Sequence, residues 1–190
     1  MYSLLSFGDL DGDGDFDAIG ATFLIGPEFY ENIGSVSQPE FASPVLTPFG
    51  IQNFPLTNGF GNPYLVDIDA DSDLDLFVVW DSEGFFWQEN TGDQTNPAFA
   101  PQTLLNIAPN YFYRTAEFAD IDSDGDYDFF FPLEDGEILF VENIGSPTAM
   151  AFGSEVVYPF GFTGELTDFR QSRFLDVDND VDLDAYASGD

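Results

Sequence analysis

The chain has 190 residues with a formal net charge of −33, and aromatic residues make up 17% of it, which is enough for a hydrophobic core. It contains no His, Cys or Lys, which excludes Ser-His-Asp and Cys-His catalysis, a Schiff-base lysine, a phosphate-binding P-loop and the usual zinc and copper sites. The negative charge argues against nucleic acid and anionic membranes as partners, and no apolar run is as long as a membrane span.

The first 50 residues predict four short strands around one acidic loop. A strand at residues 4–7 leads into a loop at residues 9–17, and a second strand follows at 18–23. A third strand at 29–30 ends in the turn Asn32-Ile33-Gly34, and a fourth begins at Phe41 and continues through 45–46. Gly and Pro are frequent, and no segment has the length and periodicity of an amphipathic helix.

The same order of features recurs along the chain. Acidic loops begin at residues 9, 67, 120 and 176, and strands are predicted at 64–66, 76–80, 85–87, 103–105, 117–119, 129–131, 138–141, 156–157, 173–175 and 185–187. A repeat of this length is typical of propeller blades. We therefore predict an all-β fold of β-propeller-type repeats in one domain, 1–190, with three full four-stranded units at about 1–61, 62–114 and 115–170 and half of a fourth at 171–190. We expect a longer chain or a second subunit to complete the last unit.

Each acidic loop has Asp at positions 1, 3, 5, 7 and 9, and 20 of the 25 Asp residues lie in these loops. Five carboxylates on nine residues repel one another unless a cation lies among them. Calcium takes six to eight oxygen ligands, whereas magnesium prefers to keep its waters. By analogy with the EF-hand, positions 1, 3, 5 and 9 donate side chains and position 7 its carbonyl oxygen. The predicted ligands of up to four Ca²⁺ ions, one per loop, are Asp9, Asp11, Asp13, Asp15 and Asp17; Asp67, Asp69, Asp71, Asp73 and Asp75; Asp120, Asp122, Asp124, Asp126 and Asp128; and Asp176, Asp178, Asp180, Asp182 and Asp184.

The pattern Asp-x-Asp-x-Asp-Gly-Asp-x-Asp between two short strands resembles the FG-GAP/VCBS repeat of integrin alpha-chain propellers and many bacterial surface proteins. The resemblance implies that each repeat is a propeller blade and that each loop binds calcium. Loops one and three match best, with Gly14 and Gly125 at position 6, where the turn favours a residue that tolerates positive φ. Ser72 and Val181 replace this glycine in loops two and four, so we expect loop four to bind calcium least well.

Apolar residues occupy positions 2 and 8 of every loop, and we expect them to pack into a core. These residues are Leu10, Ile68, Ile121 and Val177 at position 2, and Phe16, Leu74, Tyr127 and Leu183 at position 8. The aromatic residues Trp80, Phe85, Phe86 and Trp87 are interpreted as core between blades, with a sugar-binding platform as the alternative. Residues 111–114 are either the edge of a core or a ligand contact.

The sequence does not favour an enzyme. Paired carboxylates serve glycoside hydrolysis, but that reaction needs one acid kept protonated in an apolar setting, and the loops offer the opposite. Glu83, Glu134 and Glu137 are isolated acids near turns, where an active site is disfavoured.

We expect a structural or adhesive module that calcium stabilises outside the cell or on its surface, where calcium is abundant. Self-association in which the open half-unit is completed in trans would make it a subunit of a surface assembly or filament. The alternative is a carbohydrate-binding or accessory module of a secreted enzyme, and a protein or glycan ligand is compatible with both interpretations.

Overall fold

The computed structural model describes residues 5–22, 26–53, 61–80, 84–107, 115–133, 137–157, 159–161, 171–178, 180 and 183–188. Within these residues the regular structure is β-strand, and the two helical segments, η1 (Pro48–Gly50) and η2 (Pro159–Gly161), are three-residue 3-10 turns. No helix of this described part has the length and apolar character needed to cross a membrane. The all-β class predicted from the sequence is confirmed.

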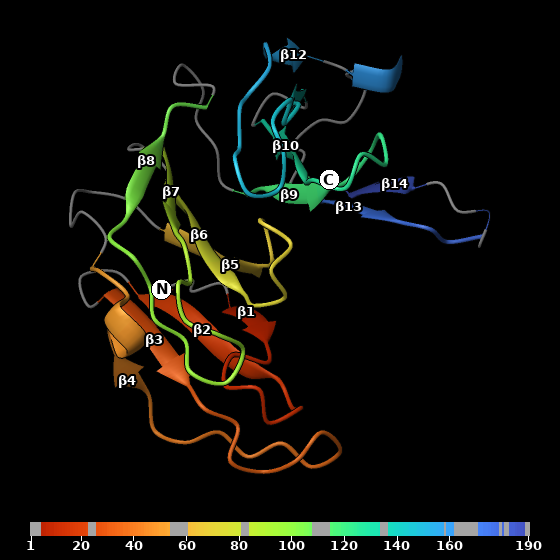
Figure 1. Cartoon of the computed structure of the whole chain (residues 1–190). Helices are drawn as coiled ribbons and strands as arrows, with labels where there is room; N and C mark the ends of the chain where they lie inside the picture. Colours follow the sequence, from red (N-terminus) through yellow and green to blue (C-terminus); the bar gives the residue numbers. More distant parts are fainter. Residues whose placement is uncertain are drawn as a thin grey trace. The chain divides into compact units, whose positions relative to one another are not determined.

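The chain forms two compact units, and the first, Met1–Asn106, contains two antiparallel sheets of four strands (Figure 1). One sheet has the order β1 (Leu5–Gly8), β2 (Asp17–Thr22), β3 (Gly26–Tyr30) and β4 (Val45–Leu46). The other has the order β5 (Gly61–Val66), β6 (Asp75–Trp80), β7 (Gly84–Gln88) and β8 (Thr103–Leu105). In both sheets neighbouring strands are consecutive in the chain, which is the arrangement of a propeller blade. We call them the first and second blades.

The second unit, Ile107–Asp190, contains one further blade and a two-stranded sheet. The third blade has the order β9 (Glu117–Ala119), β10 (Asp128–Pro132), β11 (Ile138–Val141) and β12 (Val156–Val157). The two-stranded sheet, which we call the half-blade, pairs β13 (Gln171–Leu175) with β14 (Asp184–Ser188). Three four-stranded blades and half of a fourth agree with the fold predicted from the repeats. That all 190 residues form one domain stays a prediction.

The strand boundaries differ from the predicted ones at two recurring points. Each second strand begins at position 9 of its loop, because that Asp already pairs with the end of the first strand, as in the pair Gly8 and Asp17. The fourth strand does not begin at the predicted Phe: Phe41, Phe99 and Phe152 form only isolated bridges to Asn32, Asn90 and Asn143. In the first two blades a proline follows before the strand, and proline has no N–H to donate to the ladder.

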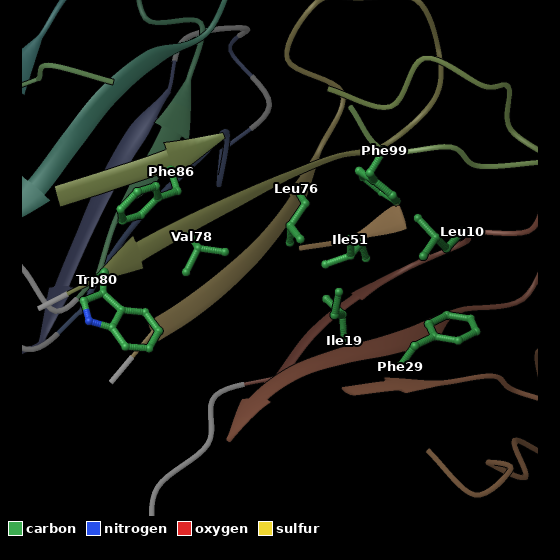
Figure 2. Close-up of a cluster of buried hydrophobic side chains, with 9 residues drawn as sticks. All are labelled: Leu10, Ile19, Phe29, Ile51, Leu76, Val78, Trp80, Phe86 and Phe99. Carbon is green, nitrogen blue, oxygen red and sulfur yellow. The ribbon is translucent and has the colours of Figure 1, made fainter. Parts of the chain in front are cut away.

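The core of the first unit lies between its two blades (Figure 2). Leu10, Ile19 and Phe29 of the first blade meet Leu76, Val78, Trp80, Phe86 and Phe99 of the second, together with Ile51. All six residues of β6 are buried, as the continuous apolar run predicts for a strand covered on both faces. Trp80 and Phe86 lie in this cluster, which confirms for these two residues the interpretation as core between blades, and Phe85 is buried as well.

The second unit repeats this plan between the third blade and the half-blade. Phe130 and Phe140 are buried with Ala119 and Ile138, and Ile121, Phe174 and Leu183 pack against them partly buried. The rings of Phe130 and Phe174 are 4.2 Å apart, and Arg173 of β13 forms an ion pair with Glu117 of β9. The half-blade is therefore fixed to the third blade by apolar contact and by charge.

Candidate metal centre

Each acidic loop connects the first two strands of a repeat, so an antiparallel pair holds both of its ends. Loop one lies between β1 and β2, loop two between β5 and β6, loop three between β9 and β10, and loop four between β13 and β14. Position 1 directly follows the first strand, and position 9 opens the second. The seven residues between them are therefore forced into a tight turn.

The turns of the first three loops bring three carboxylates together. One oxygen of each residue lies within 4.8 Å of the others in the groups Asp9, Asp11 and Asp13; Asp67, Asp69 and Asp71; and Asp120, Asp122 and Asp124. Two oxygens that bind one calcium ion at about 2.4 Å are up to about 4.8 Å apart. Positions 1, 3 and 5 therefore have the spacing of ligands to one hard cation.

Loop four gathers a different group of carboxylates. Here Asp176, Asp178 and Asp184 come together, which are positions 1, 3 and 9, and Asp180 is described but is not part of the group. Val181 and Asp182 lie outside the described residues, so the expectation that Val181 weakens this loop stays a prediction.

The loop N–H groups favour the same inward orientation of the carboxylates. In loop one, Asp9 accepts hydrogen bonds from the backbone N–H of Gly12 at 2.8 Å and of Gly14 at 3.0 Å. In loop two, Asp67 accepts from Asp71 and Ser72, both at 3.1 Å. Position 6 has positive φ in all three described cases, 94° at Gly14, 79° at Ser72 and 96° at Gly125, which confirms the expected turn.

Position 9 does not join the group of three in loops one to three, and its carboxylate instead ties the loop to the turn after the third strand. Asp17 is buried and accepts hydrogen bonds from the backbone N–H of Leu10 at 3.2 Å and of Asn32 at 2.9 Å. The bond to the Asn recurs in Asp75 with Asn90 at 2.6 Å and in Asp128 with Asn143 at 2.8 Å. Each carboxylate oxygen keeps a second lone pair, so these bonds do not prevent metal binding.

The Asn of each Asn-x-Gly turn has a role that the sequence interpretation missed. Its side-chain oxygen accepts two backbone N–H groups: for Asn32 these are Gly34 at 3.2 Å and Glu40 at 2.9 Å. A Cβ on Gly34 would lie 2.4 Å from a backbone oxygen of the turn, so only glycine fits. The constant separation of 15 residues between position 9 and this Asn was the signal that could have revealed the connection.

Position 7 is also buried, although less deeply than position 9. Asp15, Asp73 and Asp126 are buried, and the Oδ1 atom of each has no hydrogen-bond partner within the described structure. Burial, then repulsion by Asp71, raises the pKa of Asp73 to about 6. Buried carboxylate oxygens without donors are expected where a cation completes the site. That position 7 binds through its carbonyl oxygen stays a prediction.

Positions 2 and 8 do not all pack into a core as predicted. Leu10 and Ile68 are buried, and Ile121, Leu74 and Leu183 are partly buried. Phe16, Tyr127 and Val177 are exposed. Leu10 and Leu74 lie in the cluster between the first two blades, so these positions are buried where an adjacent blade covers them.

The other candidate sites are weakly supported or not described. Trp87 is half-buried and stacked on Phe77 with ring centroids 6.5 Å apart, so it does not present a free aromatic face. Glu83, Glu134 and residues 111–114 lie outside the described part of the chain. Glu137 is described, and its backbone oxygen accepts a bond from Leu133 N–H.

Comparison with known proteins supports the repeat and the fold. Residues 67–131 match the FG-GAP-like repeat, from the first Asp of loop two into β10. No curated protein matches the chain. Six chains of solved structures match it, among them a lectin of Agrocybe aegerita described as specifically recognising non-reducing terminal N-acetylglucosamine, with a TM-score of 0.53 and 19% identity. The alignment covers 82% of this chain and 37% of the lectin chain, so this chain spans little more than a third of the lectin's length.

Proposed function

We propose that this chain, which contains an FG-GAP-like repeat in a propeller-type fold, is a structural or adhesive module whose blades are stabilised by calcium. The observation that carries the proposal is the grouping of three carboxylate oxygens within 4.8 Å in each of the four loops. The buried, unpartnered Oδ1 atoms of Asp15, Asp73 and Asp126 support it independently. Calcium fits better than magnesium because the ligands are nearly all protein oxygens on a flexible loop.

Calcium would act by joining the first and second strands of each repeat. It would neutralise the repulsion among the loop carboxylates, while position 9 holds the loop to the turn after the third strand. At about 1 mM free calcium and a dissociation constant of about 10⁻⁴ M, each site stabilises the fold by about 1.4 kcal/mol. Several such sites together are comparable with the whole stability of an ordinary domain of about 5–15 kcal/mol.

Calorimetric titration with calcium and thermal melting with and without EGTA test this proposal. We expect calcium binding with a dissociation constant of about 10⁻⁴ M and a large loss of melting temperature on chelation. Asp69→Asn removes one ligand and lowers the affinity of loop two, whereas Asp93→Asn, which changes an exposed acid outside the loops, serves as the matched control. An EGTA melting curve identical to the calcium curve would refute the proposal.

The proposed location rests on the calcium affinity that is typical of extracellular calcium-binding modules. Sites of extracellular modules bind at about 10⁻⁴–10⁻³ M, so they are filled only where calcium is abundant. We therefore place the module outside the cell or on its surface, with a role in binding or assembly rather than in catalysis. Self-association that completes the half-blade in trans is part of this proposal. Immunolabelling of intact cells tests the location, and signal found only after lysis would contradict it.

Glycan binding is the second candidate, and the structural similarity to a lectin favours it. Trp87 is half-buried against Phe77, which makes the exposed residue Tyr186 a better candidate for sugar stacking. A glycan array probed with the calcium-loaded chain, with Tyr186→Ala and with Tyr113→Ala would identify such a ligand. An array without signal for the calcium-loaded chain would exclude this candidate.

A further inference from the structure

Contact between consecutive blades follows one rule in both units. We define the leading face of a blade by two positions, the residue two before the loop and loop position 8. We define its trailing face by loop position 2 and the third residue of the second strand. In the first unit, Leu65 and Leu74 on the leading face of the second blade pack into the cluster that contains Leu10 and Ile19 of the first. In the second unit, Phe174 and Leu183 on the leading face of the half-blade pack against the cluster of Phe130, with Ile121.

Backbone contacts support the same pairing in the first unit. Strand β1 lies against β5, and Leu65 N–H donates to Ser6 Oγ at 2.9 Å. The turn that follows the third strand of the second blade lies on loop one, since a Cβ on Gly12 would meet the backbone oxygen of Gln94 at 2.7 Å. Strand β13 lies against β9 in the second unit in the same way. Leading and trailing faces are therefore complementary parts of one repeated interface.

The first blade exposes its leading face. Phe7 and Phe16 occupy the positions of Leu65 and Leu74, and they are 52% and 65% exposed. Val36 occupies the position of Gln94, in the turn that would lie on a neighbouring loop, and it is 78% exposed. Three large apolar side chains on one face of a blade are more than a solvated surface requires.

The half-blade exposes the complementary trailing face. Val177 occupies the position of Leu10 and is 63% exposed, and Tyr186 occupies the position of Ile19 and is 66% exposed. Leu175 of β13 in the same half-blade is 45% exposed. Among the described residues, the first blade thus exposes a leading face and the half-blade exposes a trailing face.

We propose that the leading face of one chain docks onto the trailing face of the half-blade of a second copy, which specifies the self-association part of the proposed function. The occupant is a second copy because the chain itself supplies both complementary faces, and the packing of Leu65 and Leu74 shows what covers such residues. The contact is heterologous, so each added copy again presents one free face of each kind.

Sedimentation velocity of the full chain with about 1 mM calcium tests this interface, because that concentration fills extracellular-type sites. We expect species larger than the monomer for the unaltered chain. Phe16→Asp and Val177→Asp, each alone, lose all such species. Mixed in equal amounts, the two variants form heterodimers and nothing larger, since each keeps one intact face. The matched control is Leu104→Asp, which places the same charge on the exposed outer strand β8, outside both faces, and assembles like the unaltered chain.

Three outcomes would overturn the inference: a monomeric unaltered chain in calcium, variants that assemble normally, or a mixture that stays monomeric. Calorimetry on the same samples separates this failure from failure of the proposed function. Calcium binding without assembly would refute only the proposed interface between copies. Absence of calcium binding would refute the proposal that calcium stabilises the blades. Circular dichroism of each variant in calcium shows whether lost assembly reflects lost folding.

Discussion

Leu74 and Phe16 occupy the same position of the repeat but have opposite environments. Leu74 packs into the core between the first and second blades, whereas Phe16 is 65% exposed, and Leu65 and Phe7 differ in the same way. Hydrophobicity does not explain the difference, because both members of each pair are large and apolar. The adjacent blade decides: the face that meets a neighbour is core, and the equivalent face without one is surface.

The largest effect is expected from equivalent residues at loop position 2. Leu10→Ala removes a buried side chain from the core between the blades and should cost about 2–5 kcal/mol. Val177→Ala, at the same position of the half-blade, should change the free energy of unfolding by no more than about 0.5 kcal/mol in dilute samples. Urea denaturation in calcium measures both values. Equal costs would mean that repeat position, and not the neighbouring blade, sets stability.

The buried acids at loop position 9 predict how the stability of the calcium-free chain depends on pH. Burial raises the pKa of Asp75 to about 7 and that of Asp128 to about 6, from the ordinary 3.8. The calcium-free fold therefore holds more protons than the unfolded chain between pH 3.8 and about 7, and its stability is lost as pH rises through that window.

Melting of the calcium-free chain between about pH 5 and 8 should therefore give a falling melting temperature. Asp75→Asn should make the decrease of melting temperature with rising pH smaller. Asp93→Asn should leave it unchanged, because hydrogen bonds from Thr95 hold the pKa of Asp93 below its ordinary value, outside the window. A melting temperature that rises with pH in EGTA would contradict the assignment of buried, uncompensated carboxylates.

A smaller difference is expected at loop position 8. Leu74→Ala removes a partly buried side chain and should cost about 1–2 kcal/mol, whereas Phe16→Ala should change stability by less than about 0.5 kcal/mol. Chemical denaturation of dilute samples provides both numbers. A cost for Phe16→Ala as large as that for Leu74→Ala would show that the first blade's leading face is covered within one chain.

The smallest effect concerns the turn itself. Ser72 has φ of 79° where Gly14 and Gly125 have φ of 94° and 96°, and a side chain is strained in this region. Ser72→Gly should stabilise the calcium-loaded chain by about 0.5–1 kcal/mol, and Gly14→Ser should destabilise it by a similar amount. Differential scanning calorimetry detects both shifts. Changes of the same sign in the two variants would disprove the equivalence of the turns.

Much of the fold could be predicted from the sequence because the repeat shows each feature several times. The loop spacing and the short apolar runs predicted four-stranded units, and the structure has three such sheets and one pair of strands. The grouping of positions 1, 3 and 5 in loops one to three follows from the alternation of Asp on a tight turn. Binding of calcium by these groups is a prediction that titration has to test.

Tertiary structure decided what local pattern does not encode. The hydrogen bond from the Asn32 N–H to the Asp17 carboxylate joins two segments 15 residues apart, and it cannot be predicted from either segment alone. Loop position predicted the same burial for Leu10 and Val177, but only Leu10 has a neighbouring blade packed over it. The periodic sequence by itself determined the repeating blade and its acidic loop, because strand and turn formation depend on nearby residues. Burial depends on removing a side chain from water, and only the packing of one blade on another does that.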